Sequence, residues 1–166
     1  MTGGSRPAPF GVGFLLSQLG LLSASNFARL VAPLGVTPPH VGLLRAITDS
    51  PGRSQQALAD EFGMPASRMV VLLDDLEARG LVERRRDPAD RRVHLLHATP
   101  EGVDLMTRVE EAGKDAERRL LQALSAAERK QLKDLLLRIA DDQRLTRGVH
   151  PGYRTLRPKS THAAKG

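Results

Sequence analysis

Apolar residues recur at three- and four-residue intervals along most of the chain, a spacing that predicts helices rather than strands. The first such stretch runs from Gly11 to about Val31 and is apolar on most of its sides. A helix with so little polar surface requires a partner beyond its own domain. Further helices are predicted over these segments: Thr37 to near Pro51, Ser54 to Phe62, Pro65 to Arg79, Thr99 to about Leu121, and Ser125 to a stop at Gly148.

Local signals mark where these helices start and stop. Thr37-Pro38 and Thr99-Pro100 each place a capping hydroxyl before a proline at the first helical position. The run Ser125-Ala126-Ala127-Glu128 has the spacing of a capping box. Gly63 is expected to make a tight turn between two helices, and Gly80 to follow a helix in the left-handed conformation.

The pattern changes after Gly80, where two short runs suit the strands of a hairpin. The strands are predicted over Leu81 to Arg86 and Arg92 to Ala98, joined by the turn Asp87-Pro88-Ala89-Asp90. Clustered arginines bind phosphates by displacing counterions, and one at a hairpin tip can enter a narrow minor groove. The acidic residues of the turn are expected to orient arginines through paired hydrogen bonds. A solvated charged hairpin is the alternative. The arginines of this segment are Arg84, Arg85, Arg86, Arg91 and Arg92.

The helices on either side of Gly63 have the arrangement of a helix-turn-helix. In that motif the first residues of the second helix meet base edges in the major groove. Ser67 can bind bases or phosphates, Arg68 can bind guanine through its two parallel donors, and Val71 can contact a thymine methyl group. The alternative is an ordinary helical hairpin in a core.

Composition narrows the function. The 166 residues fit one domain with extensions, and the net charge of +6 favours a polyanionic partner. The absence of cysteine excludes disulfides, thiolate metal sites and thiol redox sensing. The apolar stretch from Phe10 to Leu22 is short for a bilayer and is interrupted by Gln18, so we expect a cytoplasmic protein without a membrane partner.

Signals for catalysis or metal binding are lacking in the sequence. There is no nucleophile elbow and no phosphate-cradling glycine loop, so no catalytic residue is assigned and no enzyme is expected. His94 and His97 point to opposite faces of a predicted strand, and no other histidine has metal-ligand spacing. We therefore expect neither a metal nor a cofactor.

Taken together, the motifs resemble the MarR (multiple antibiotic resistance regulator) family of winged-helix transcription factors. The resemblance covers roughly Gly13 to Ile139. The residues that carry it are Leu34-Gly35-Val36-Thr37-Pro38, Leu58-Ala59-Asp60-Glu61-Phe62-Gly63, Leu72-Leu73-Asp74-Asp75-Leu76-Glu77-Ala78-Arg79-Gly80-Leu81-Val82, Asp87-Pro88-Ala89-Asp90-Arg91-Arg92 and Ala98-Thr99-Pro100-Glu101-Gly102.

The resemblance implies a mainly α fold with a small β wing: a dimeric winged helix-turn-helix of about six helices and a two- to three-stranded sheet. It implies that Asp90 steadies the wing, that Arg92 enters the minor groove, and that Arg91 contacts phosphate. The predicted DNA-binding residues are Ser54, Gln55, Pro65, Ala66, Ser67, Arg68, Val71, Arg84, Arg86, Asp90, Arg91 and Arg92. The predicted segments are 1–10 (disordered), 11–36 (dimerisation), 37–98 (DNA binding), 99–148 (dimerisation) and 149–166 (flexible basic tail).

The expected function is a sequence-specific regulator, a repressor that binds a pseudo-palindromic operator in double-stranded DNA as a homodimer. The resemblance implies a small phenolic or other apolar anionic effector, in a pocket for which Phe14, Phe27, Arg29 and His40 are the candidates. Asp74 and Asp75 depart from a basic recognition helix and are expected either to weaken DNA binding or to pair with wing arginines. A protein-interaction module, and a DNA-binding regulator without a ligand, are the alternatives.

Overall fold

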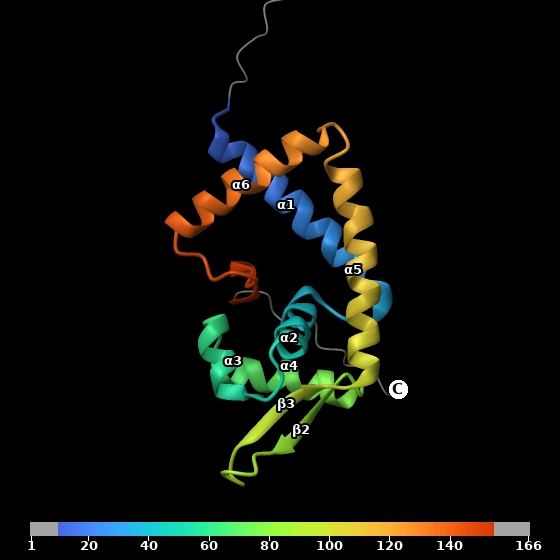
Figure 1. Cartoon of the computed structure of the whole chain (residues 1–166), viewed down its shortest axis with the longest axis vertical. Helices are drawn as coiled ribbons and strands as arrows, with labels where there is room; N and C mark the ends of the chain where they lie inside the picture. The colour runs from blue at the N-terminus through green and yellow to red at the C-terminus, as the bar shows by residue number, and fades with distance from the viewer. Residues whose placement is uncertain (1–9, 155–166) are drawn as a thin grey trace, which may run out of the picture.

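The computed structural model describes residues 10–154, which form a helical frame above a smaller lobe that carries a hairpin (Figure 1). The frame consists of α1, α6 and the upper part of α5, and the lobe contains α2, α3, α4 and the sheet. The elements in chain order are α1 (Val12–Val31), the 3₁₀ helix η1 (Ala32–Leu34), α2 (Pro38–Asp49), β1 (Arg53–Ser54), α3 (Gln55–Phe62), α4 (Ala66–Ala78), β2 (Val82–Arg86), β3 (His94–Ala98), α5 (Pro100–Leu120), α6 (Ala126–Asp142) and the 3₁₀ helix η2 (Pro151–Arg154).

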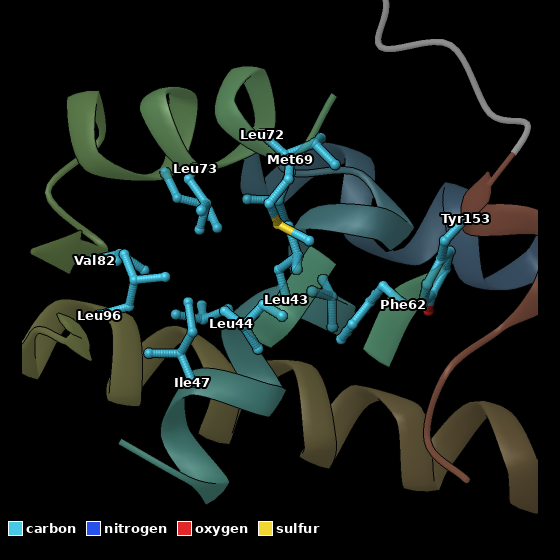
Figure 2. Packing of buried hydrophobic residues seen from close by; sticks show 14 of the residues in the cluster. Leu43, Leu44, Ile47, Phe62, Met69, Leu72, Leu73, Val82, Leu96 and Tyr153 are labelled. Carbon is cyan, nitrogen blue, oxygen red and sulfur yellow. The ribbon is translucent and has the colours of Figure 1, made fainter. Parts of the chain in front are cut away.

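The core of the lobe surrounds α2, which is buried on most of its faces. Figure 2 shows Leu43, Leu44 and Ile47 of α2 packed between α4 and the sheet. Each fully buried side chain of this size contributes about 1.5–3 kcal/mol through removal of apolar surface from water. The partners of α2 in this cluster include Phe62 from α3, Met69, Leu72 and Leu73 from α4, Val82 from β2 and Leu96 from β3.

The sheet is antiparallel with the strand order β1-β3-β2. The hairpin pairs Val82 with Ala98 at its base and Arg86 with His94 near its tip. The short strand β1 adds a third edge through Arg53 and Ser54. The expected six helices and small sheet are therefore confirmed, with both hairpin strands slightly shorter than predicted.

Most predicted helix boundaries match the structure. Thr99 caps α5 through its hydroxyl, which accepts the Gly102 N–H, and Ser125 forms the expected capping box with Glu128. Gly80 adopts the predicted positive φ, 70°, and Gly63, at the predicted tight turn, also has a positive φ of 55°.

The C-terminal part of the chain differs from expectation in two ways. Helix α6 ends at Asp142 rather than near Gly148, because Arg144 takes a left-handed φ of 53° that breaks the helix. The segment expected to be a flexible tail from residue 149 begins with packed residues. Val149 and Tyr153 are buried, and Tyr153 lies beside Phe62 in the lobe (Figure 2). The correction applies to 149–153; the ranges 1–9 and 155–166, to which the other disorder expectations apply, lie outside the described residues.

Helix α5 approaches the start of the hairpin through Gly102. A Cβ atom at this position would lie 2.2 Å from the carbonyl oxygen of Leu81, which is backbone and cannot move aside cheaply. The close approach places the first turn of α5 directly against the base of the wing.

We expect Gly102→Ala to lower the free energy of unfolding by about 1–3 kcal/mol, because the added methyl group overpacks this contact. Val103→Ala is the control: Val103 is exposed, and a surface substitution of this kind changes stability by less than about 0.5 kcal/mol. Urea denaturation followed by circular dichroism, at one protein concentration, measures both. Equal stability of Gly102→Ala and the wild type would contradict the close approach.

Candidate nucleic-acid interface

The helix-turn-helix consists of α3 and α4, joined through Gly63. The turn is closed by backbone hydrogen bonds from Gly63 to Asp60 and from Met64 to Ala59. This connection buries one face of α4 in the core and leaves its N-terminal end on the surface. The predicted residues Pro65, Ala66, Ser67 and Val71 are exposed, and Arg68 is half-buried.

Two predicted contacts at the start of α3 have structural roles as well. The Ser54 hydroxyl oxygen accepts the Ala57 N–H at 3.2 Å and so caps the helix. Ser54 is also part of β1, where it pairs with Leu95. Gln55 follows as the first residue of α3 and is half-buried. A polar, partly exposed helix start of this kind can bind a phosphate through backbone N–H groups.

The wing turn is shaped by two carboxylates that bind backbone groups. Asp87 accepts the Ala89 N–H at 2.8 Å, and Asp90 accepts the Arg92 N–H at 3.0 Å. The backbone bonds between Asp87 and Val93 and between Val93 and Asp90 close the loop. The expectation that these carboxylates hold guanidinium groups is therefore wrong: they fix the main chain instead, and so determine where the arginine side chains begin.

The five arginines of the hairpin fall into two groups. Arg84 contacts Asp74 at 2.6 Å and also pairs with Glu77, both on α4, while Arg85 pairs with Glu83 on its own strand. Within the described part of the chain, the guanidinium groups of Arg86, Arg91 and Arg92 form no ion pair, and all three are exposed. The unneutralised positive charge is thus concentrated at the outer end of the wing.

Asp74 accordingly takes the second of its two expected roles, because it binds a wing arginine. This pairing joins the recognition helix to β2, so the helix and the wing are held together by charge as well as by the core. Exposed ion pairs of this type contribute up to about 1 kcal/mol. Their main effect here is to keep Arg84 directed toward α4.

Asp75 belongs to a different cluster, beneath the recognition helix. Arg79 donates to the Asp75 carboxylate at 2.9 Å and also to the carbonyl oxygen of Gly35. His40 Nε2 lies 3.1 Å from the same carboxylate, although this contact does not have hydrogen-bond geometry. The cluster links the start of α2 to the middle of α4 and turns Asp75 away from a role at the DNA surface.

His40 is held as a neutral imidazole in this cluster. Its Nδ1 accepts the backbone N–H of Thr37 at 3.2 Å, which requires an unprotonated nitrogen. Burial lowers the pKa of His40 below its usual 6.5, outweighing the Asp75 carboxylate, which raises it; Arg79 lowers it further. The histidine therefore caps α2 in its uncharged form.

A largely apolar cavity of about 720 Å³ lies between the C-terminal half of α1, the start of α2 and the C-terminal segment. Of the four residues predicted to bind a ligand, Phe27 lines this cavity. Phe14 instead stacks on Phe10 near the start of α1, Arg29 bonds Asn26 on the surface, and His40 faces the Asp75 cluster. The polar residues that line the cavity are Ser23, Ser25, Thr37, His150 and Tyr153.

Sequence reasoning missed His150 and Tyr153, because the segment from residue 149 was expected to be a flexible tail. The available signal was Val149 and a tyrosine within an otherwise polar segment. In the structure, Tyr153 stacks on Phe62 with ring centroids 6.4 Å apart. The C-terminal segment is thus part of both the cavity and the core.

Comparison with known proteins identifies the family. Residues 34–93 match the model of the MarR family. A protein named for transcriptional regulation of the hcr operon in Thauera aromatica is 38% identical over 129 residues, which cover 77% of this chain and 78% of the relative. The chain belongs to the MarR family.

Solved structures of MarR proteins have the same fold. The transcriptional repressor CouR, bound to a 23-mer DNA duplex, superposes with a TM-score of 0.70 at 32% identity, covering 82% of this chain and 99% of that chain. Rv2887 of Mycobacterium tuberculosis, solved with p-aminosalicylic acid, gives a TM-score of 0.64 at 27% identity, with 79% of this chain and 99% of that chain covered. The chain is a MarR-family transcriptional regulator with a winged helix-turn-helix fold.

MarR proteins are dimers, and this chain exposes the apolar surface that a dimer requires. Helix α6 has no buried residue and makes no substantial contact with the other described elements. By length and composition alone Val12–Leu34 could also cross a membrane, whereas the expectation above was based on the shorter stretch from Phe10 to Leu22. Only 6% of an 18-residue window within that span is buried, so its apolar surface is available to a second subunit. The large exposed apolar residues of the two helices are Val12, Phe14, Leu15, Leu16, Leu19, Leu21, Leu22, Leu135, Leu136, Leu137 and Ile139.

The His40 cluster predicts a specific dependence of stability on pH. Because the folded state lowers the pKa of His40, the unfolded chain binds more protons just below pH 6.5, and stability falls as the pH drops through this window. His40→Asn retains an acceptor for the Thr37 N–H but cannot titrate. We expect its stability to fall less than that of the wild type between about pH 7.5 and about pH 5.

Urea denaturation at several pH values measures this difference. The slopes are compared rather than the absolute stabilities, because the variant also loses packing around the imidazole. The other histidines are common to both proteins and cancel in the comparison. Parallel pH profiles would show that His40 titrates alike in the folded and unfolded states.

Proposed function

We propose that this protein is a ligand-responsive repressor that acts in the cytoplasm and binds a pseudo-palindromic operator as a homodimer, and that it is not an enzyme. The observation that carries the proposal is the pairing of an exposed recognition-helix N-terminus with three unneutralised arginines at the wing tip. These two features lie on one lobe, where they can reach adjacent grooves of a duplex. Membership of the MarR family and the likeness to the DNA-bound repressor CouR support it.

Each exposed residue is assigned a role from its position. Ser67 and Val71 project from the first turns of α4 and meet base edges, with Pro65 and Ala66 allowing close approach to the groove. Arg92 enters the minor groove from the turn that Asp90 fixes. Arg86 and Arg91 bind phosphates beside it. Ser54 and Gln55 present the start of α3 to the backbone of the same duplex.

Arg68 and Arg84 are assigned differently from the other basic residues. Arg68 is half-buried in the first turn of α4, and its Nε and Nη2 atoms are buried, so we assign it to a base edge that it contacts after its side chain turns outward. Arg84 is neutralised by Asp74 and Glu77, so we assign it to holding the wing on the recognition helix rather than to phosphate binding. The local charge that attracts DNA is therefore carried by the wing tip.

The homodimer forms through the helical frame. The apolar faces of α1 and α6 are unoccupied within the described chain, and α5 runs from the lobe into the frame (Figure 1). Burying these faces against a second copy removes apolar surface from water, which is the dominant favourable contribution to association of this kind. The spacing of the two recognition helices then follows from how the frames pack, and it has to match the half-sites of the operator.

The effector binds in the cavity between α1, α2 and residues 150–153. Its apolar lining with a few polar groups suits a small aromatic acid. Rv2887 was solved with p-aminosalicylic acid and with salicylic acid, the second at 28% identity and a TM-score of 0.63, covering 83% of this chain and 99% of that chain. A ligand that prefers the dimer with wrongly spaced recognition helices lowers DNA affinity by population shift.

Arg92→Ala is expected to weaken operator binding about 10-fold, because it removes the arginine at the groove. It should also reduce the slope of log affinity against log salt by about 1. Arg85→Ala is the matched control, since Arg85 is exposed on the same hairpin but paired with Glu83. The measurement is fluorescence anisotropy at several salt concentrations, with an operator selected from a random duplex library.

The control should bind within about twofold of the wild type, which is a small free-energy change. If Arg92→Ala binds with wild-type affinity, the assigned wing role is wrong. Wild-type protein that binds no duplex, or binds without salt dependence, would overturn the DNA-binding proposal and favour a protein-interaction module.

Salicylate tests the cavity. We expect it to raise the melting temperature of the wild type and to release operator DNA, because it binds one state of the dimer preferentially. Phe27→Ala should weaken both effects by about 10-fold or more, since the ring lines the cavity. Arg29→Ala should change neither, because Arg29 lies outside it. Equal responses in Phe27→Ala and wild type would show that salicylate does not bind in this cavity.

A further inference from the structure

The C-terminal residues 149–153, called the strap below, return from the helical frame and dock in the DNA-binding lobe. Tyr153 is 9% exposed and its ring stacks on Phe62, a core residue of α3, with an interplanar angle of 15°. Val149 is buried as well. The last described part of the chain therefore ends inside the part of the molecule that binds DNA (Figure 2).

The lobe has a complementary site for the tyrosine ring. A Cβ atom on Gly42 would lie 2.5 Å from Tyr153 Cε2, and the three nearest atoms all belong to that ring. Gly42 is in the middle of α2, where glycine costs about 0.5–1 kcal/mol relative to alanine. The absent side chain leaves the space that the ring occupies, so the contact is close and specific.

The connection between the strap and α6 is ordered. After α6 ends, Leu145 donates to the Ala140 carbonyl oxygen, and Arg147 binds the Asp141 carboxylate at 2.9 Å. Within the strap, the backbone N–H of Gly152 donates to His150 Nδ1 at 3.0 Å, and Tyr153 donates to the His150 carbonyl oxygen. A displacement of α6 can therefore reach Tyr153 through a folded segment rather than a loose chain.

Within the described chain, the other contacts of α6 on its own subunit are slight: Arg129 donates to the carbonyl oxygens of Leu121 and Leu124 in the turn after α5. None of its residues is buried, and its apolar face is available to the second subunit. The strap thus joins α6, which belongs to the helical frame, to the lobe that carries the recognition helix. The helical frame is also joined to the lobe by η1, by the length of α5 and by the C-terminal end of α1, where Val31 is part of the core.

We propose that the strap sets the position of the DNA-binding lobe relative to the helical frame, with Tyr153 as the positioning residue. This inference rests on the proposed function, since it concerns how a dimer presents two lobes to one operator. With the ring docked, the two recognition helices are restrained before DNA arrives. With the ring undocked, binding to two half-sites at once has to order the lobes and costs affinity.

The strap also forms part of the effector cavity, through His150 and Tyr153. A ligand there contacts α1, the start of α2 and the strap together. It can change how the strap docks and thereby alter the position of the lobe, with few contacts to α4. The same residues therefore provide a physical route from the cavity to the spacing of the two recognition helices.

Tyr153 provides its own spectroscopic probe. It is the single tyrosine of the chain, which has no tryptophan, so tyrosine fluorescence and absorbance report on this ring alone. Burial raises the pKa of the Tyr153 hydroxyl above its usual 10, against the lowering effect of Arg45. Acrylamide quenching and tyrosinate absorbance at high pH both measure whether the ring is docked.

The test uses Gly42→Ala, Tyr153→Ala, the double variant and Tyr153→Phe. In Gly42→Ala the added methyl group should displace the ring, so acrylamide quenching rises and the melting temperature falls. In the Tyr153→Ala background the same substitution should not lower the melting temperature, because the space is already empty. Tyr153→Phe retains the ring and should have the melting temperature of the wild type, although it lacks the tyrosine signal.

The decisive measurement compares a full operator with a duplex that carries one half-site. Gly42→Ala and Tyr153→Ala should each bind the full operator about 10-fold more weakly, and the double variant no more weakly than either. Binding to the single half-site should be unchanged, because it does not require two positioned lobes. Tyr153→Phe should retain full affinity for both.

The outcomes separate the two proposals. Wild-type affinity of Gly42→Ala for the full operator, with the ring shown by quenching to be undocked, would overturn the strap inference and leave the regulator intact. Equal losses on both duplexes would assign Tyr153 to general stability and would also overturn it. Failure of the wild type to bind either duplex would overturn the proposed function itself.

Discussion

The DNA-binding lobe depends on the burial of α2. This helix contacts the recognition helix, the sheet, α5 and the strap, and its side chains Leu43, Leu44 and Ile47 are fully buried. Because every element that would meet DNA packs against α2 or against a neighbour of α2, their relative positions are fixed by one apolar core. The polar cluster at its start has the same effect, because His40 and Arg79 both contact Asp75 and so join the α2 cap to α4.

Charge is arranged on this lobe so that neighbouring arginines have different partners. Successive residues of β2 point to opposite faces, so Arg84 reaches the acidic residues of α4 while Arg85 reaches Glu83. The turn beyond them is shaped by Asp87 and Asp90 through backbone hydrogen bonds, which leaves its arginines without acidic partners in the described chain. The net charge of +6 therefore understates how unevenly the positive charge is distributed.

Much of this arrangement follows from local sequence signals. Helix caps and turn glycines act over a few residues, so their effects can be predicted from the sequence. The caps at Thr99 and Ser125 and the turns at Gly63 and Gly80 match the structure. The pairing of Asp74 with Arg84 was one of two open alternatives, because it depends on how β2 lies across α4.

The features that could not be predicted are those that depend on distant contacts. Tyr153 looked like part of a polar tail because its partners, Phe62 and Gly42, are far away in the sequence. The ligand candidates were selected by element position, and a single one of them, Phe27, lines the cavity, since which face of a helix meets a cavity depends on tertiary packing. Arg144 ended α6 early through a backbone conformation that its side chain does not announce.

The link between Arg84 and the recognition helix has a consequence for how an operator is selected. The ion pairs between Arg84 and α4 oppose changes in the distance between the wing and that helix. Under the proposed function, the separation between the major-groove and minor-groove elements then acts as a gauge. A duplex with a wide or stiff minor groove at that separation has to deform before the wing fits, and the deformation energy depends on base steps that no side chain touches. Under the proposed function, part of the sequence preference is thereby carried by the mechanical properties of the DNA.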